Sequence, residues 1–283
     1  MENKKYHQKG FYNKGKESAY RDRKGAEHRL SEREENAIGN GAVIGRNAVR
    51  ELLRSGRAVD KIFVQSGTHE GALVPLVGEA LERGIPVVET ERRKLDALAQ
   101  NAPHQGIIAL AAEKEYCSLE DILAIAEERG EKPLIVVADG IADPYNLGAV
   151  IRCAEGCGAH GLVIPKRHAA GLSPVVSKAS AGAIEHLAVA KVPNIAAAVE
   201  TLKKAGVWIY AAEAGAADFR KTDMNRAVAI VLGSEGEGVS EIVRKKCDYT
   251  VSIPMYGKVN SFNVSTAAAV LLCEAARQQR SND

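Results

Sequence analysis

The sequence lacks any apolar run close to the roughly 20 residues that a membrane-spanning helix needs. Its N-terminus is polar, with neither the apolar core of a secretory signal nor the acid-poor composition of a transit peptide. Aromatic residues make up 5% of the 283 residues, but 46% are hydrophobic, which is enough to bury sizeable cores and suggests about two domains. We therefore expect a globular, cytoplasmic protein with no membrane partner.

Cysteine is scarce and odd in number, and the scattered single thiols indicate a reducing compartment instead of a disulfide framework. Cys153 and Cys157 lie four residues apart on an expected helix, but no His or second Cys pair completes a metal-ligand set, so core packing is the better interpretation. The seven histidines show no ligand spacing. We expect no metal.

The net charge of +2 is unevenly distributed. Residues 1–24 contain eight Lys or Arg and three acids, so this segment is at +5 and the remainder is at −3. Aromatic side chains lie among the basic ones, a mixture that can pair phosphates and stack on bases. The segment has no helical or strand period. Residues 1–38 are therefore expected to be a basic, disordered tail, which either contacts RNA or is solvated without a partner.

Residues 39–113 alternate between expected helices and strands and form a compact α/β domain. Residues 114–117 are a polar linker into a second domain at 118–283. Six short Val/Ile-rich runs in the second domain are separated by helical stretches, which predicts an α/β fold with a parallel sheet covered by helices on both faces. The runs are 133–139, 161–165, 187–192, 207–213, 227–233 and 249–255.

Ligands of an open parallel sheet bind beyond the carboxyl ends of its strands, where three polar or Gly-rich loops follow. In the first, "DGIADPYNLGAVIR", Asp143-Pro144 is expected to break the chain, with a helix from Leu147 that carries Arg152 one and a half turns in. Arg152 would either pair with Asp139 or Asp143, or bind a phosphate or carboxylate with its guanidinium.

The second loop, "GSEGEGVS", has glycines in an order unlike the dinucleotide-binding fingerprint. Its acids disfavour a phosphate cradle and suit an adenosine or a cationic centre. The third loop, "IPMYGKVNSFNVS", gathers six polar or turn-forming residues just before an apolar helix. One or two such residues would serve as a helix cap, so six favour a binding loop.

Three stretches together resemble the motifs of the SpoU-type RNA ribose 2′-O-methyltransferases of the SPOUT superfamily. They are "DPYNLGAVIRCAEGCGAHGLVIP", "IVLGSEGEGVSEIVRKKCD" and "IPMYGKVNSFNVSTAAAVLLCEAAR". "GRNAVRELLRSG", "DKIFV" and "QGIIAL" resemble the family's RNA-binding domain, which is akin to small ribosomal proteins. The combination is similar to the 23S ribosomal RNA (guanosine-2′-O)-methyltransferase branch.

This resemblance implies a deep trefoil knot at the C-terminus, an obligate homodimer and S-adenosylmethionine as methyl donor. It places catalytic groups at Asn146, Arg152, Glu235, Ser261 and Asn263. It places cofactor contacts at Leu232, Gly233, Ile253, Met255, Phe262 and Val264. Phe262 and Thr266 stand where the family more often has Leu and Val, so we expect some repacking around the adenine without loss of activity.

A ribose 2′-hydroxyl must lose its proton and be aligned with the methyl group, so positioning and proton removal are the tasks of the protein. Arg152 deprotonates so reluctantly that we favour it as a phosphate clamp that also stabilises a forming alkoxide. Glu235 would accept a hydrogen bond or orient Arg152, and Asn146 would fix either one. Two alternatives stay open: a tRNA ribose methyltransferase of the same family, and a non-catalytic RNA-binding protein in ribosome assembly.

Overall fold

The computed structural model describes residues 41–67, 71–100 and 102–280. The basic tail predicted at residues 1–38 lies outside these ranges. By their contacts, the residues in these ranges form one compact unit. Within the described ranges there are two sheets, one of four strands and one of six. No described helix is both long enough and apolar enough to cross a membrane.

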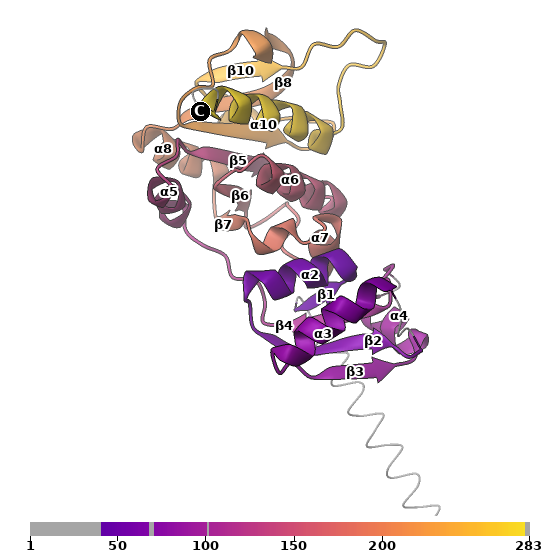
Figure 1. Ribbon diagram of the computed structural model, residues 1–283. Coiled ribbons are helices and arrows are strands. Elements are labelled where there is room, and N and C mark those ends of the chain that lie inside the picture. Colours follow the sequence, from indigo (N-terminus) through magenta and orange to yellow (C-terminus); the bar gives the residue numbers. More distant parts are fainter. Residues whose placement is uncertain (1–40, 68–70, 101, 281–283) are drawn as a thin grey trace, which may run out of the picture. The chain divides into compact units, whose positions relative to one another are not determined.

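The four-stranded sheet has the order β1-β4-β2-β3, in which only β2 and β3 are parallel (Figure 1). Leu52, Ile62 and Ile107 are fully buried in the core between this sheet and its helices. The strands are β1 (Ala42–Ile44), β2 (Val59–Gln65), β3 (Val87–Thr90) and β4 (Ile107–Ala111), and the helices are α2 (Arg46–Ser55), η1 (Gly71–Leu73), α3 (Val74–Glu82) and α4 (Arg92–Leu98).

The six-stranded sheet has the order β10-β8-β9-β5-β6-β7, and every neighbouring pair is parallel, which confirms the predicted parallel sheet. All six predicted apolar runs form its strands. They are β5 (Leu134–Asp139), β6 (Gly161–Pro165), β7 (Ala188–Val192), β8 (Trp208–Asp218), β9 (Val228–Gly233) and β10 (Tyr249–Ser252).

Helices cover both faces of this sheet. Side chains alternate along each strand, so a buried strand contributes to the cores on both faces. In β5, Leu134 and Val136 enter the core that holds α6 and α10, whereas Ile135 and Val137 enter the core that holds α5 and α8. Helices α6 and α10 are in contact on their shared face (Figure 1). The helical elements are α5 (Leu119–Glu128), α6 (Pro144–Gly156), α7 (Pro174–Ala179), η2 (Ala183–Glu185), α8 (Ile195–Lys204), η3 (Phe219–Lys221), α9 (Glu241–Arg244) and α10 (Val264–Arg280).

One expectation about local structure was wrong. Helix α6 begins at Pro144 and not at Leu147, because Pro144 occupies the first helical position, where its missing N–H costs nothing. Asp143 is the N-cap and accepts hydrogen bonds from the backbone N–H groups of Tyr145 and Asn146. Arg152 is therefore the ninth residue of the helix and lies beyond its first two turns.

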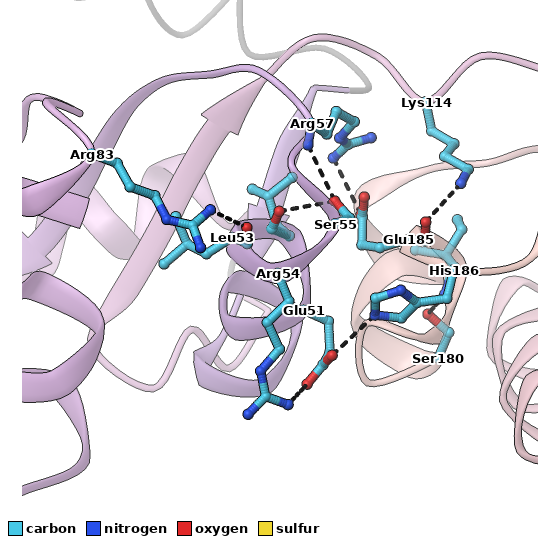
Figure 2. Close-up of polar contacts among 12 residues, drawn as sticks. Glu51, Leu53, Arg54, Ser55, Arg57, Arg83, Lys114, Ser180, Glu185 and His186 are labelled. Carbon is cyan, nitrogen blue, oxygen red and sulfur yellow. Dashed lines mark hydrogen bonds and ion pairs between the residues drawn. The ribbon is translucent and has the colours of Figure 1, made fainter. Parts of the chain in front are cut away.

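A group of ionic contacts joins α2 and the turn after it to η2, as Figure 2 shows. Arg57 Nη2 lies 3.3 Å from Glu185 Oε1, and Lys114 Nζ donates to the Glu185 carbonyl oxygen. His186 Nε2 lies 3.0 Å from Glu51 Oε2. The Glu185 side chain is 1% exposed, and its burial raises the pKa of the carboxyl group against the opposing effect of Arg57.

Candidate functional site

The first two motif loops begin side by side at the carboxyl edge of the six-stranded sheet. In the pairing of β5 with β9, Asp139 lies opposite Gly233, and these are the last residues of the two strands. Asp139 Oδ2 also accepts a hydrogen bond of 2.8 Å from the backbone N–H of Ser240. The second motif loop is thus fixed to the strand that carries the first.

The second loop is a tight turn with little room for side chains near its base. The backbones of Ser234 and Gly238 exchange two hydrogen bonds of 3.1 Å. A Cβ atom on Gly233 would stand 1.9 Å from the carbonyl carbon of Gly238 and 2.1 Å from the nitrogen of Val239. Only glycine lets these two backbone segments approach so closely.

The third loop leads from β10 into α10, and its last residue anchors the helix. Asn263 Oδ1 accepts hydrogen bonds from the backbone N–H of Ser265 (2.9 Å) and from its Oγ (2.6 Å). The capping interpretation of this loop therefore holds for Asn263. The same side chain also turns its amide nitrogen toward the other two loops.

Asn146, Glu235 and Asn263 meet in one hydrogen-bonded group, which we call the Asn–Glu–Asn cluster. Asn146 Nδ2 donates to Glu235 Oε1 over 2.8 Å. Asn263 Nδ2 donates to Asn146 Oδ1 over 3.0 Å and to Glu235 Oε1 over 3.1 Å. Each motif loop contributes one member, so residues up to 117 positions apart converge at one point.

A cavity of about 650 Å³ opens between the second and third loops and the strands β8, β9 and β10. Its size falls within the range of about 300–1,000 Å³ that is usual for sites of small organic ligands. Nine of the eleven site residues expected from the sequence border it. They are Leu232, Gly233, Glu235, Ile253, Met255, Ser261, Phe262, Asn263 and Val264.

Asn146 and Arg152 do not border this cavity. Asn146 is connected to the cavity by its hydrogen bond to Glu235, which borders it. The Arg152 side chain is exposed, and neither Asp139 nor Asp143 forms an ion pair with it among the described residues, because these carboxylates accept backbone N–H groups instead. The ion-pair alternative for Arg152 is therefore not what the structure shows. Ser261 is also exposed.

The sequence reasoning missed several features of this region. Asp139 was weighed only as an ion-pair partner, yet it fastens the second loop. The Arg220 side chain donates a hydrogen bond of 3.1 Å to the hydroxyl of Tyr256 in the third loop, and nothing in the spacing pointed to that contact. Among the described residues, no group of three His, Cys, Asp or Glu side chains is placed to hold a metal ion.

Two family models match the chain. Residues 133–273 match the SpoU rRNA methylase family, and residues 42–117 match the substrate-binding domain of RNA 2′-O ribose methyltransferases. The chain is 43% identical over 238 residues to YacO of Bacillus subtilis, which is assigned to the TrmH family of tRNA/rRNA methyltransferases. The alignment covers 84% of this chain and 95% of YacO. A relative with the same assignment from Staphylococcus haemolyticus is 40% identical, over 84% of this chain and 95% of its own length.

Solved structures agree with these matches. The SpoU methyltransferase AviRb of Streptomyces viridochromogenes, in complex with the cofactor AdoMet, aligns with a TM-score of 0.70 and 27% identity over 85% of this chain and 90% of its own. A structure of an RNA 2′-O ribose methyltransferase aligns with a TM-score of 0.69 and 28% identity over 84% of this chain and 88% of its own. The chain belongs to the TrmH/SpoU family of RNA methyltransferases.

Proposed function

We propose that this enzyme transfers a methyl group from S-adenosylmethionine to a ribose 2′-hydroxyl of RNA, and that the acceptor is a guanosine of 23S ribosomal RNA. The observation that carries the proposal is the placement of the Asn–Glu–Asn cluster at the edge of a cavity of ligand size. A methyl donor in the cavity and an acceptor beside the cluster would bring the reacting atoms together.

The cavity suits the adenosine part of the donor. Its wall combines backbone near Gly233, where a Cβ has no room, with the apolar side chains of Leu232, Ile253 and Phe262. We assign the cofactor contacts to these residues together with Met255 and Val264. S-adenosylmethionine supplies an electrophilic methyl group on a sulfonium. The AviRb complex with AdoMet supports this choice of donor.

The acceptor side is assigned to Asn146, Arg152, Glu235, Ser261 and Asn263. Arg152 is exposed and carries no ion pair with the nearest motif carboxylates, so its guanidinium is available for a phosphate of the substrate. Asn146 and Asn263 orient the carboxylate of Glu235. Ser261 lies beside the cavity as a further hydrogen-bonding group for the ribose.

The choice of RNA rests on the two family-model matches and on the assignments of the relatives. Residues 42–117 match a substrate-binding model, which supports the proposed RNA-binding domain at 39–113. The linker at 114–117 is a proposal from the sequence. The assignments of the relatives cover both tRNA and rRNA, so a tRNA ribose is the alternative acceptor. The match of residues 133–273 to a family described by rRNA methylation favours ribosomal RNA.

Two further features are proposed for the domain at 118–283: a trefoil knot formed by threading α10 through a loop, and a homodimer. The packing of α10 against α6 and β9 is compatible with such threading. Light scattering of the purified protein tests the homodimer. Refolding kinetics test the knot, because threading a chain would add a slow phase.

The assignment is tested by incubating the enzyme with radiolabelled S-adenosylmethionine and total RNA from cells that lack the gene. We expect label in ribosomal RNA. After alkaline hydrolysis the label should remain in a dinucleotide, because a 2′-O-methyl group blocks cleavage of the phosphodiester bond that follows the methylated nucleotide. Label in the tRNA fraction would select the alternative acceptor. Calorimetry with S-adenosylmethionine alone reports on cofactor binding separately, and no heat at millimolar ligand would refute the assignment of the cavity.

A further inference from the structure

The orientation of Glu235 is fixed by a chain of hydrogen bonds that starts in the backbone. The N–H of Ser265 can only donate, so the atom of Asn263 that faces it must be Oδ1. The Nδ2 group of Asn263 then faces Glu235 and Asn146. Because Asn146 accepts through Oδ1, its own Nδ2 also donates to Glu235. Both amide orientations follow from one backbone donor.

Both amides converge on the same oxygen of the carboxylate. Glu235 Oε1 receives hydrogen bonds of 2.8 Å from Asn146 and 3.1 Å from Asn263, whereas Oε2 receives no hydrogen bond from the described residues. An oxygen with two N–H donors is occupied as an acceptor. The open acceptor of this carboxylate is therefore Oε2, held in place by the hydrogen bonds to its partner oxygen.

Few other groups at the cavity can accept a proton. Among the described residues that border it, the only side chains with an ionisable group are Glu213, Glu235 and Glu237. Glu213 Oε1 accepts a hydrogen bond of 2.8 Å from Arg244. Glu237 is exposed, and no hydrogen bond or ion pair holds it in one position within the described chain. Of the three, only Glu235 combines an open oxygen with hydrogen bonds from residues of the other two motif loops, whereas Glu213 is paired with the cation of Arg244.

Resting on the function proposed above, we propose that Glu235 is the general base, with Oε2 as the atom that takes the proton of the ribose 2′-hydroxyl. The 2′ oxygen forms a bond to the methyl carbon while the bond from that carbon to sulfur breaks, and the sulfonium becomes a neutral thioether. The proton of the hydroxyl moves to Oε2, and its release to water restores the carboxylate. Charge and atoms balance without a metal or a further reactant.

A carboxylate is a weak base, but the timing of the transfer makes it sufficient. As the 2′ oxygen bonds to the methyl carbon it becomes positive, and its proton becomes far more acidic than that of a free hydroxyl. Proton transfer to Oε2 is then downhill at the transition state. Arg152 cannot take this role, since a guanidinium has no acceptor atom while it is charged. In this scheme Arg152 binds phosphate, and Asn146 and Asn263 are positioning residues.

The test compares single-turnover methyl transfer by Glu235→Gln, Glu235→Ala and Glu241→Gln on total RNA from cells that lack the gene. Glu241 is an exposed carboxylate on α9, paired with Lys245 and outside the cavity, and is the matched control. Glu235→Gln should lose about 10²- to 10⁴-fold in rate, the usual contribution of a general base, with unchanged affinity for S-adenosylmethionine by calorimetry. Its remaining rate should rise more steeply with pH than the wild-type rate, because hydroxide from the solvent then replaces the missing base.

Formate added to Glu235→Ala separates a catalytic role from a structural one. Free formate can replace the missing base but cannot replace the hydrogen-bonded side chain. We expect partial recovery of the rate that saturates with formate. A wild-type rate for Glu235→Gln, or loss without a changed pH profile and without rescue, would overturn the assignment. A comparable loss in Glu237→Gln with Glu235→Gln active would move the role to Glu237. An inactive wild-type enzyme would instead refute the proposed function itself.

Discussion

Asn146 Nδ2 donates a hydrogen bond of 2.8 Å to Glu235 Oε1, although the two residues are 89 positions apart in the chain. One stands in the first turn of α6 and the other in the loop after β9. The contact exists because β5 and β9 are adjacent parallel strands that end at the same edge. It ties the proposed acceptor side of the site to Glu235, which borders the cavity proposed for the cofactor.

Replacing Asn146 with Asp tests this contact. The substitution exchanges an N–H donor for a carboxylate oxygen beside Glu235, and two like charges at this distance repel each other. We expect methyl transfer to fall at least as far in Asn146→Asp as in Asn146→Ala, with cofactor affinity retained in both. Initial rates and calorimetry measure the two effects. An Asp variant with more activity than the Ala variant would contradict the role of the amide as a donor.

Much of the large sheet was predictable because its strands contain continuous apolar runs, and β5, β6 and β9 are buried along almost their whole length. The strand β1 was not predicted, since three residues before a helix carry no readable period. The order β10-β8-β9-β5-β6-β7 is set by contacts between distant segments and has no signature in local spacing. The start of α6 was misplaced because Pro144 was treated as a chain break, whereas proline also favours the first helical position.

The site was predicted as a set of residues but not as a geometry. The rule that loops cluster at the carboxyl edge of a parallel sheet brought the three motifs together in principle. Which groups would pair was open, and an ion pair of Arg152 was among the alternatives. The structure pairs Glu235 with two asparagines. This pairing depends on the backbone N–H of Ser265, in the first turn of α10, which orients the amide of Asn263.

Gly233→Ala should abolish cofactor binding. The added methyl group would stand 1.9 Å from backbone carbon of Gly238, so the second loop must move away from the strand. Calorimetry with S-adenosylmethionine measures the effect, and circular dichroism checks that the protein remains folded. Gly156→Ala is the matched control, because a Cβ there meets nothing within 4 Å. Cofactor affinity of Gly233→Ala equal to that of the control would contradict the placement of the cofactor.

Stability should fall as the pH drops below about 6.5, the ordinary pKa of histidine, in part through His160. Burial lowers the pKa of His160 more than the contact with Glu131 raises it, and Nδ1 accepts the N–H of Leu134 over 3.0 Å. The unfolded chain then binds a proton that the folded chain excludes, so protonation favours unfolding in the range between the two pKa values. We would measure the melting temperatures of the wild type and of His160→Asn between about pH 5 and pH 8, a range that brackets the ordinary pKa of histidine. The two should differ most at the acid end.

The His160→Asn variant keeps an acceptor for Leu134 and removes the titrating ring. Its melting temperature should therefore depend less steeply on pH than that of the wild type. Parallel curves for the two proteins would show that His160 does not contribute to the acid sensitivity.

The ion pair of Arg57 and Glu185 should be sensitive to the loss of its cation (Figure 2). Arg57→Ala leaves a buried carboxyl group without that partner, at a cost of about 3 kcal/mol in the free energy of unfolding. Glu185→Gln removes the charge whose burial is unfavourable and should cost much less. The double variant should be more stable than Arg57→Ala alone, and urea unfolding of the four proteins measures the coupling. Additive losses would show that the pair is not coupled.

The central claim is tested most directly by mapping 2′-O-methyl groups across total RNA from cells with the gene, without it, and complemented with the wild type or with Arg152→Ala. The account predicts that one ribose methyl group, on a guanosine of 23S ribosomal RNA, disappears with the gene and returns with the wild type only. Arg152→Ala should fail because it lacks the exposed guanidinium that we propose for binding the acceptor strand. The affinity of this variant for S-adenosylmethionine, measured by calorimetry, should stay close to that of the wild type. Identical 2′-O-methyl maps in all four strains would contradict the account.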